Sequence, residues 1–122
     1  MTIDDWQWLL ETAQANANGA LTKPIDLTRL RRLAPDCSLS DSEVQKVLNN
    51  GGAAGLLVEL YSRVCEGRAR LQEAIASLPT ADDVERARLI AALQQLADSD
   101  PYLVNRTVAR ETLDAIARGR YR

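Results

Sequence analysis

An apolar stripe along positions 56–78 constrains most strongly how this chain can fold. Its members recur at alternating steps of three and four: Leu56, Leu60, Val64, Gly67, Leu71, Ala74 or Ile75, and Leu78. This spacing places them on one face of a continuous helix. The pattern therefore predicts a long helix over about 53–78 whose apolar face is covered by other helices. Gly67 lies inside the stripe, where it either lets another helix approach closely or simply weakens the helix.

Capping motifs and breakers predict further helices on both sides of this one. Hydroxyl or carboxylate caps precede most of the remaining apolar periodic runs. Three glycines in NNGGAAG, at 49–55, separate the long helix from the one before it, and Asp100 is expected to cap a helix that begins at Pro101. The expected helices span about 2–15, 26–33, 40–49, 53–78, 81–97 and 101–118.

Leucine and alanine dominate the apolar fraction of 46%, and β-branched and aromatic residues are few, a mixture that favours helices over strands. We therefore predict an all-α single domain over 1–122 with about six helices. The short connections between the last three predict an antiparallel three-helix bundle over 53–119, with the three shorter helices of 1–50 packed on it. The residues expected to face inward in the first helix are Ile3, Trp6, Leu9, Leu10 and Ala13, and those in the last are Leu103, Leu113 and Ile116.

The composition disfavours several classes of function. The chain has no histidine, so the commonest general base and metal ligand are missing, and we expect no catalytic residues, no metal, no cofactor and no small-molecule substrate. A net charge of −2 argues against a dedicated polyanion binder. No apolar run is long enough to span a membrane and no signal-peptide pattern is present, so we expect a cytoplasmic protein with two reduced cysteines. The excess of arginine over lysine suggests a bacterial or phage origin.

Two tryptophans two residues apart, in DDWQWLLE at 4–11, provide the best clue to function. Positions i and i+2 of a helix point about 200° apart, so both side chains cannot enter one core. If Trp6 faces inward, Trp8 faces outward and is a candidate anchor for a partner, because exposed tryptophan is enriched at binding hot spots. In the alternative, the loop at 16–24 folds back over Trp8. The candidate partner-binding residues on the face of Trp8 are Trp8, Glu11, Thr12 and Ala15.

A second segment, LTRLRRLAPDCSLSDSEVQKVLNN at 27–50, resembles a helix-turn-helix. Its second half, LSDSEVQKVLNN, is similar to the recognition-helix region of the lac-repressor family. The resemblance implies that Ser42, Gln45 and Lys46 face the major groove of DNA while arginines approach phosphates. The same arginines, which lack an obvious acidic neighbour, could instead contact an acidic protein partner: Arg29, Arg31 and Arg32.

The sequence therefore favours a small, non-enzymatic helical interaction protein, such as an adaptor, an inhibitor or an assembly factor. We expect it to act by protein–protein binding or self-association as a homo-oligomer, with the N-terminal helix as the main contact surface. The alternative is a DNA-binding transcriptional regulator that uses the helix-turn-helix at about 27–50. It ranks second because Asp41 and Glu43, at the start of the would-be reading helix, repel phosphates.

Overall fold

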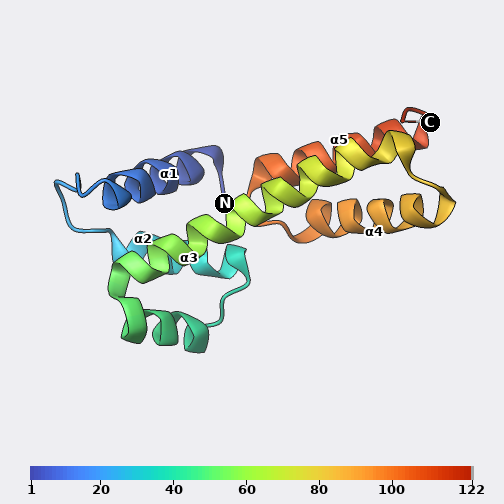
Figure 1. Ribbon diagram of the computed structural model, residues 1–122. Helices are drawn as coiled ribbons and strands as arrows, with labels where there is room; N and C mark the ends of the chain where they lie inside the picture. The colour runs from blue at the N-terminus through green and yellow to red at the C-terminus, as the bar shows by residue number, and fades with distance from the viewer. Residues whose placement is uncertain (122) are drawn as a thin grey trace. The chain divides into compact units, whose positions relative to one another are not determined.

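The protein is all-helical, as the sequence predicts, and Figure 1 shows the order of its helices along the chain. The computed structural model describes residues 1–121. Within that range the chain forms no strand and falls into two compact units, Met1–Val64 and a second that begins at Cys65. Its helices are α1 (Ile3–Ala17), α2 (Leu27–Leu33), α3 (Asp41–Ser77), α4 (Asp83–Ser99) and α5 (Leu103–Ala117), with short 3-10 helices η1 (Ala34–Cys37) and η2 (Leu78–Thr80).

The third and fourth expected helices form the single element α3, which is why five α-helices are present in residues 1–121 instead of about six. Within α3, a first arm at 41–51 and a second arm at 53–77 are nevertheless separated where the glycine run predicts a break. Gly52 has φ 65° and ψ −160°, a backbone conformation outside the helical region and almost restricted to glycine. The chain therefore turns sharply at Gly52, and α3 consists of two helices joined across this kink.

The first unit has a leucine core drawn from three helices. The fully buried leucines are Leu9 from α1, Leu30 from α2, and Leu56, Leu57 and Leu60 from α3, and Val64 of α3 is buried as well. Arg63 of α3 also donates from Nη1 to the carbonyl oxygen of Cys37 in η1 at 3.1 Å. The part of α3 up to Val64 therefore belongs to the core of the first unit.

Two residues predicted to face inward are exposed. Ile3 is 56% exposed and Leu103 is 41% exposed, so these predictions are wrong. Each is the first residue of its helix and lies six positions before a buried residue, Leu9 or Ala109. Six residues correspond to about 120° of rotation from the buried side chain, which takes both residues off the packed face.

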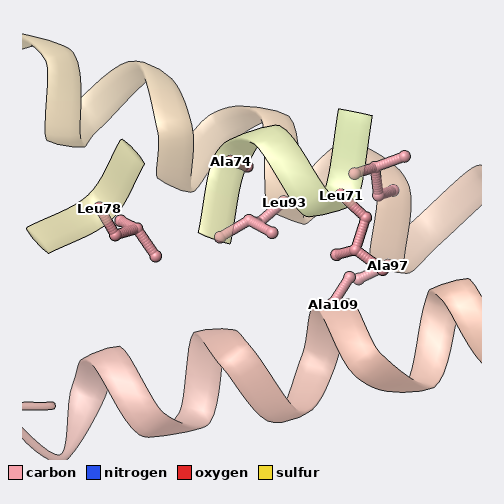
Figure 2. Close-up of a cluster of buried hydrophobic side chains, with 7 residues drawn as sticks. Leu71, Ala74, Leu78, Leu93, Ala97 and Ala109 are labelled. Atoms are coloured by element: carbon pink, nitrogen blue, oxygen red, sulfur yellow. The ribbon is translucent and has the colours of Figure 1, made fainter. Parts of the chain in front are cut away.

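The second unit packs the last part of α3, with η2, against α4 and α5. Its core consists of Leu71, Ala74, Leu78, Leu93, Leu96, Ala97 and Ala109, six of which are labelled in Figure 2. This cluster draws on the three helices expected to form the C-terminal bundle. The bundle core begins at Leu71, later than the sequence predicts, because the preceding leucines of α3 are buried in the first unit.

The turn between α4 and α5 is organised by Asp100, whose side chain is buried, with 4% of the residue exposed. Its Oδ2 accepts hydrogen bonds from the Tyr102 N–H and from Asn105 Nδ2, both at 3.0 Å. The carboxylate lies directly against the Cα position of Gly67, where an added Cβ would overlap it. Asp100 is thus not the cap of a helix beginning at Pro101, because α5 begins at Leu103 and Asp100 closes the turn before it. Gly67 therefore has a close neighbour, but that neighbour is the side chain of Asp100 in the turn and not the helix that the sequence suggests.

The Asp100 carboxyl predicts how pH affects the second unit. Burial raises its pKa above the ordinary value of 3.8, although the hydrogen bonds from Tyr102 and Asn105 and the charges of Arg106 and Arg70 act in the opposite direction. The folded state therefore holds this proton more tightly than the unfolded state does. We expect Asp100 to contribute a gain in the free energy of unfolding as pH falls through the raised pKa toward 3.8, with no further gain below that value.

The measurement is a series of denaturant melts of the wild type and Asp100→Asn, compared at each pH. Asparagine keeps a carbonyl oxygen for the two donors but cannot titrate in this range. The stability of the wild type relative to Asp100→Asn should rise as the solution is acidified. A difference that stays flat, or that falls on acidification, would contradict the raised pKa.

Candidate binding groove

The start of α1 is fixed by a capping box. The Thr2 hydroxyl accepts from the Asp5 N–H at 3.1 Å, and Asp5 Oδ2 accepts from the Thr2 N–H at 3.3 Å. The other carboxylate oxygen of Asp5 lies 3.3 Å from both Arg29 and Arg32 of α2. Burial alone would raise the pKa of Asp5, but the hydrogen bonds from Thr2 and Arg29 and the charge of Arg32 hold it below its ordinary value. Asp5 thus both caps α1 and ties it to α2.

The two tryptophans of α1 have different neighbours, as their positions on the helix require. Trp6 stacks on Tyr61 of α3, with ring centroids 5.6 Å apart and an interplanar angle of 12°. The Arg29 guanidinium lies over the ring of Trp8, 4.5 Å from its centroid, in a cation–π contact. Both tryptophans are half-buried, so Trp8 is more covered than the outward-facing side chain that the helix period predicts.

Beside Trp8 the surface is hollowed into a groove of about 330 Å³, which we call the Trp8 groove. One wall is the face of α1 that carries Trp8, Glu11, Thr12 and Ala15. The other wall is the irregular segment Ala20–Asp26, between α1 and α2. The chain after α1 does return toward Trp8, as the alternative interpretation supposed, but it leaves an open space between itself and the helix.

The charged side chains of the Trp8 groove are not engaged in ion pairs with the rest of the described chain. Glu11 accepts a hydrogen bond from Gln7 at 3.2 Å, and Asp26 accepts from the Arg29 N–H at 3.1 Å as the N-cap of α2. Both donors are neutral. Lys23 is the one basic side chain in the groove lining among residues 1–121.

A second, more polar hollow of about 430 Å³ adjoins the groove at Asp26 and is lined by Asp26, Thr28, Arg29 and Arg32. The Nε atom of Arg29 is buried and has no hydrogen-bond partner within residues 1–121. The Arg29 side chain is 29% exposed, and its terminal nitrogen is held by Asp5. Arg29 thus lines the second hollow, contacts Trp8 of the first, and has one N–H donor without a partner in residues 1–121.

The structure brings together most of the predicted partner-binding residues. Trp8, Glu11, Thr12 and Ala15 line the groove, Arg29 covers one face of Trp8, and Arg32 shares Asp5 with Arg29. Arg31 is exposed on α2 and lines neither hollow.

The residues of the DNA-binding alternative lie on the first arm of α3, where Ser42, Gln45 and Lys46 are all exposed. Glu43 closes a capping box with Ser40, whose N–H and hydroxyl donate to its carboxylate and lower its pKa. A 3-10 helix, η1, lies in the turn between α2 and α3. Because its pKa is lowered, Glu43 places an ionised carboxylate in the first turn of the arm that would read DNA.

The sequence indicates the second wall of the groove only through the alternative in which the loop at 16–24 folds back over Trp8, and it does not predict an open groove between them. The segment Ala20–Asp26 has no periodicity, and the Asn, Gly and Pro residues of 16–24 mark this part of the chain only as an irregular connection. The sequence predicts only a capping role for Asp5, because nothing in it indicates that the arginines of α2 lie against the start of α1.

No helix within residues 1–121 is long and apolar enough to cross a membrane. The same residues contain no group of three or more acidic or cysteine side chains that could hold a metal ion. Cys37 is buried, Cys65 is half-buried, and neither forms a disulfide. No family model, no curated protein and no solved structure matches this chain.

Proposed function

We propose that this protein is a non-enzymatic interaction protein that binds another protein, or a second copy of itself, at the Trp8 groove. The observation that carries the proposal is the position of Trp8, a half-buried indole that forms the wall of an open hollow. Aromatic side chains in partly formed pockets are typical hot spots of protein interfaces. In this proposal Trp8 does not project into the partner as an outward-facing anchor, but forms the wall of a groove that receives a side chain of the partner.

DNA binding is the second candidate, and the contacts of α2 favour it less. Two of its three arginines, Arg29 and Arg32, share the Asp5 carboxylate, which offsets one of their two positive charges and so reduces the charge offered to phosphates. Glu43, near the start of the arm that would read bases, is ionised at neutral pH. Arg29 and Arg32 therefore help to hold α2 against α1 within the first unit.

The proposal predicts different effects for substitution of the two tryptophans. Trp6→Ala removes a half-buried ring that stacks on Tyr61 and should cost about 3 kcal/mol of stability, the lower end of the range for large-to-small aromatic changes. Trp8→Ala removes a cation–π contact worth about 0.5–1 kcal/mol and part of a half-buried surface, so it should cost less stability than Trp6→Ala. It should, however, weaken binding by about 2 kcal/mol or more, the size expected of a hot spot.

Stability is measured by denaturant melts at concentrations where any oligomer has dissociated. Association is measured by light scattering of the purified protein and by affinity capture from cells, with Arg31→Ala as an exposed control outside both hollows. A partner, or a self-associated form, should be retained by Arg31→Ala and lost by Trp8→Ala. Equal association of all the folded variants would remove the Trp8 groove as the contact surface.

A further inference from the structure

The segment that forms the second wall of the Trp8 groove has backbone groups that form no hydrogen bond within the described chain. Within the described chain, no N–H or C=O of Leu21–Ile25 takes part in a hydrogen bond. The N–H of Ala20 just before it donates to Ala15, and the carbonyl of Asp26 just after it accepts from Leu30. The unpaired run therefore coincides with the wall of the groove. Such a run offers donors and acceptors to an incoming backbone.

The groove also combines an apolar surface with an excess of acid. Trp8, Ala15 and Leu21 supply apolar surface, and Leu21 is among the exposed large hydrophobic residues. The charged lining residues are Glu11, Asp26 and Lys23, two acids to one base, and none of the three is ion-paired within residues 1–121. Arg29, over the indole, shares the Asp5 carboxylate with Arg32, and neither arginine is among the residues that line the groove. A positively charged side chain is thus complementary to the groove.

We propose that the Trp8 groove binds a linear peptide segment of a partner protein that carries a basic residue close to a bulky apolar one. The apolar side chain packs on Trp8, the basic side chain lies between Glu11 and Asp26, and the peptide backbone bonds to Leu21–Ile25. This inference rests on the proposed function, since it names the chemical class of the partner at the same groove.

The test selects heptapeptides from a random library displayed on phage against the whole wild-type protein. Selected sequences are then synthesised with both ends blocked and their affinities measured. The charge variant is the double substitution Glu11→Gln and Asp26→Asn, in which asparagine keeps the N-cap of α2. The matched control is Glu73→Gln with Asp98→Asn, which removes two exposed acids outside the groove. A third variant is Trp8→Ala.

Selected peptides should carry Lys or Arg within two positions of a large apolar residue. Their affinity should fall at least tenfold in the charge variant and in Trp8→Ala, and it should be unchanged in the matched control. Methylation of alternate backbone nitrogens of the peptide should weaken binding to the wild type. It removes peptide N–H groups that would donate hydrogen bonds to the carbonyl oxygens of Leu21–Ile25.

Two results would overturn the inference, and they differ in what they imply for the proposed function. Peptides that depend on Trp8 but are acidic or uncharged, or that bind the charge variant as tightly as the wild type, reject the basic partner and leave the groove as a binding site. Peptides that bind Trp8→Ala as well as the wild type, or the absence of any selected peptide, reject the inference; a partner captured through Trp8 would still support the proposed function.

Discussion

The variant Gly67→Ala should destabilise the second unit by about 3 kcal/mol or more. The added methyl group would overlap the buried Asp100 carboxylate, and relief requires that carboxylate to move. Movement breaks the hydrogen bonds to Tyr102 and Asn105, each of which costs about 1–3 kcal/mol when a buried donor is left unsatisfied. The gain in helix propensity from glycine to alanine, about 1 kcal/mol, is too small to compensate. Denaturant melts followed by circular dichroism measure the loss.

A double-mutant cycle with Asp100→Ala isolates the cause. Asp100→Ala alone should be destabilising, because it leaves the Tyr102 N–H and the Asn105 amide without their acceptor. In that background, however, Gly67→Ala meets no carboxylate and should be neutral or slightly stabilising. If Gly67→Ala costs the same with and without Asp100, the contact between these two residues is not the reason for the glycine.

The second large effect is expected at the break in α3. Gly52 has a φ of 65° with ψ near −160°, a combination that a residue with a Cβ adopts only at a cost of about 1–3 kcal/mol. Gly52→Ala should therefore destabilise the first unit by that amount even though no atom lies within 4 Å of the added methyl group. Strain in the backbone, and not crowding, is the cause.

The neighbouring glycine provides a matched control. Gly51 is equally exposed, also has no atom within 4 Å of an added Cβ, and does not have a positive φ. Gly51→Ala should be neutral or stabilising by up to about 1 kcal/mol, because it lowers the entropy of the unfolded chain. Destabilisation of similar size in both variants would contradict the assignment of strain to Gly52.

The helices could be predicted from sequence because their signals are local. The caps at Thr2, Ser40 and Asp82 act within one turn, and apolar spacing marks the faces. Burial was harder to predict at helix starts, as Ile3 and Leu103 show, because the period alone does not say which part of a wide apolar face meets a neighbour. Gly67 illustrates a further limit. Its partner, Asp100, lies 33 positions away, so the sequence can indicate a close approach without naming what approaches.

In the candidate site, too, one wall follows from local sequence signals and the other depends on contacts between distant positions. The face of Trp8, Glu11, Thr12 and Ala15 follows from helix geometry, and the structure places these residues on one wall of a groove. The opposite wall is an irregular segment whose path depends on how α2 docks on α1 through Asp5 and Arg29. That docking is a tertiary contact across 24 positions, and nothing in local propensity encodes it.

The placement of the tryptophans also determines what their emission reports. Both indoles belong to Met1–Val64, Trp6 against Tyr61 and Trp8 under Arg29, while the unit that begins at Cys65 contains tyrosine but no tryptophan. Excitation at a wavelength that only indole absorbs therefore gives a signal with origins in the first unit alone, whereas helical ellipticity sums over both. A melt followed by the two signals together separates the loss of one unit from the loss of the other without any label. The chain thus carries an intrinsic probe confined to one half of its fold.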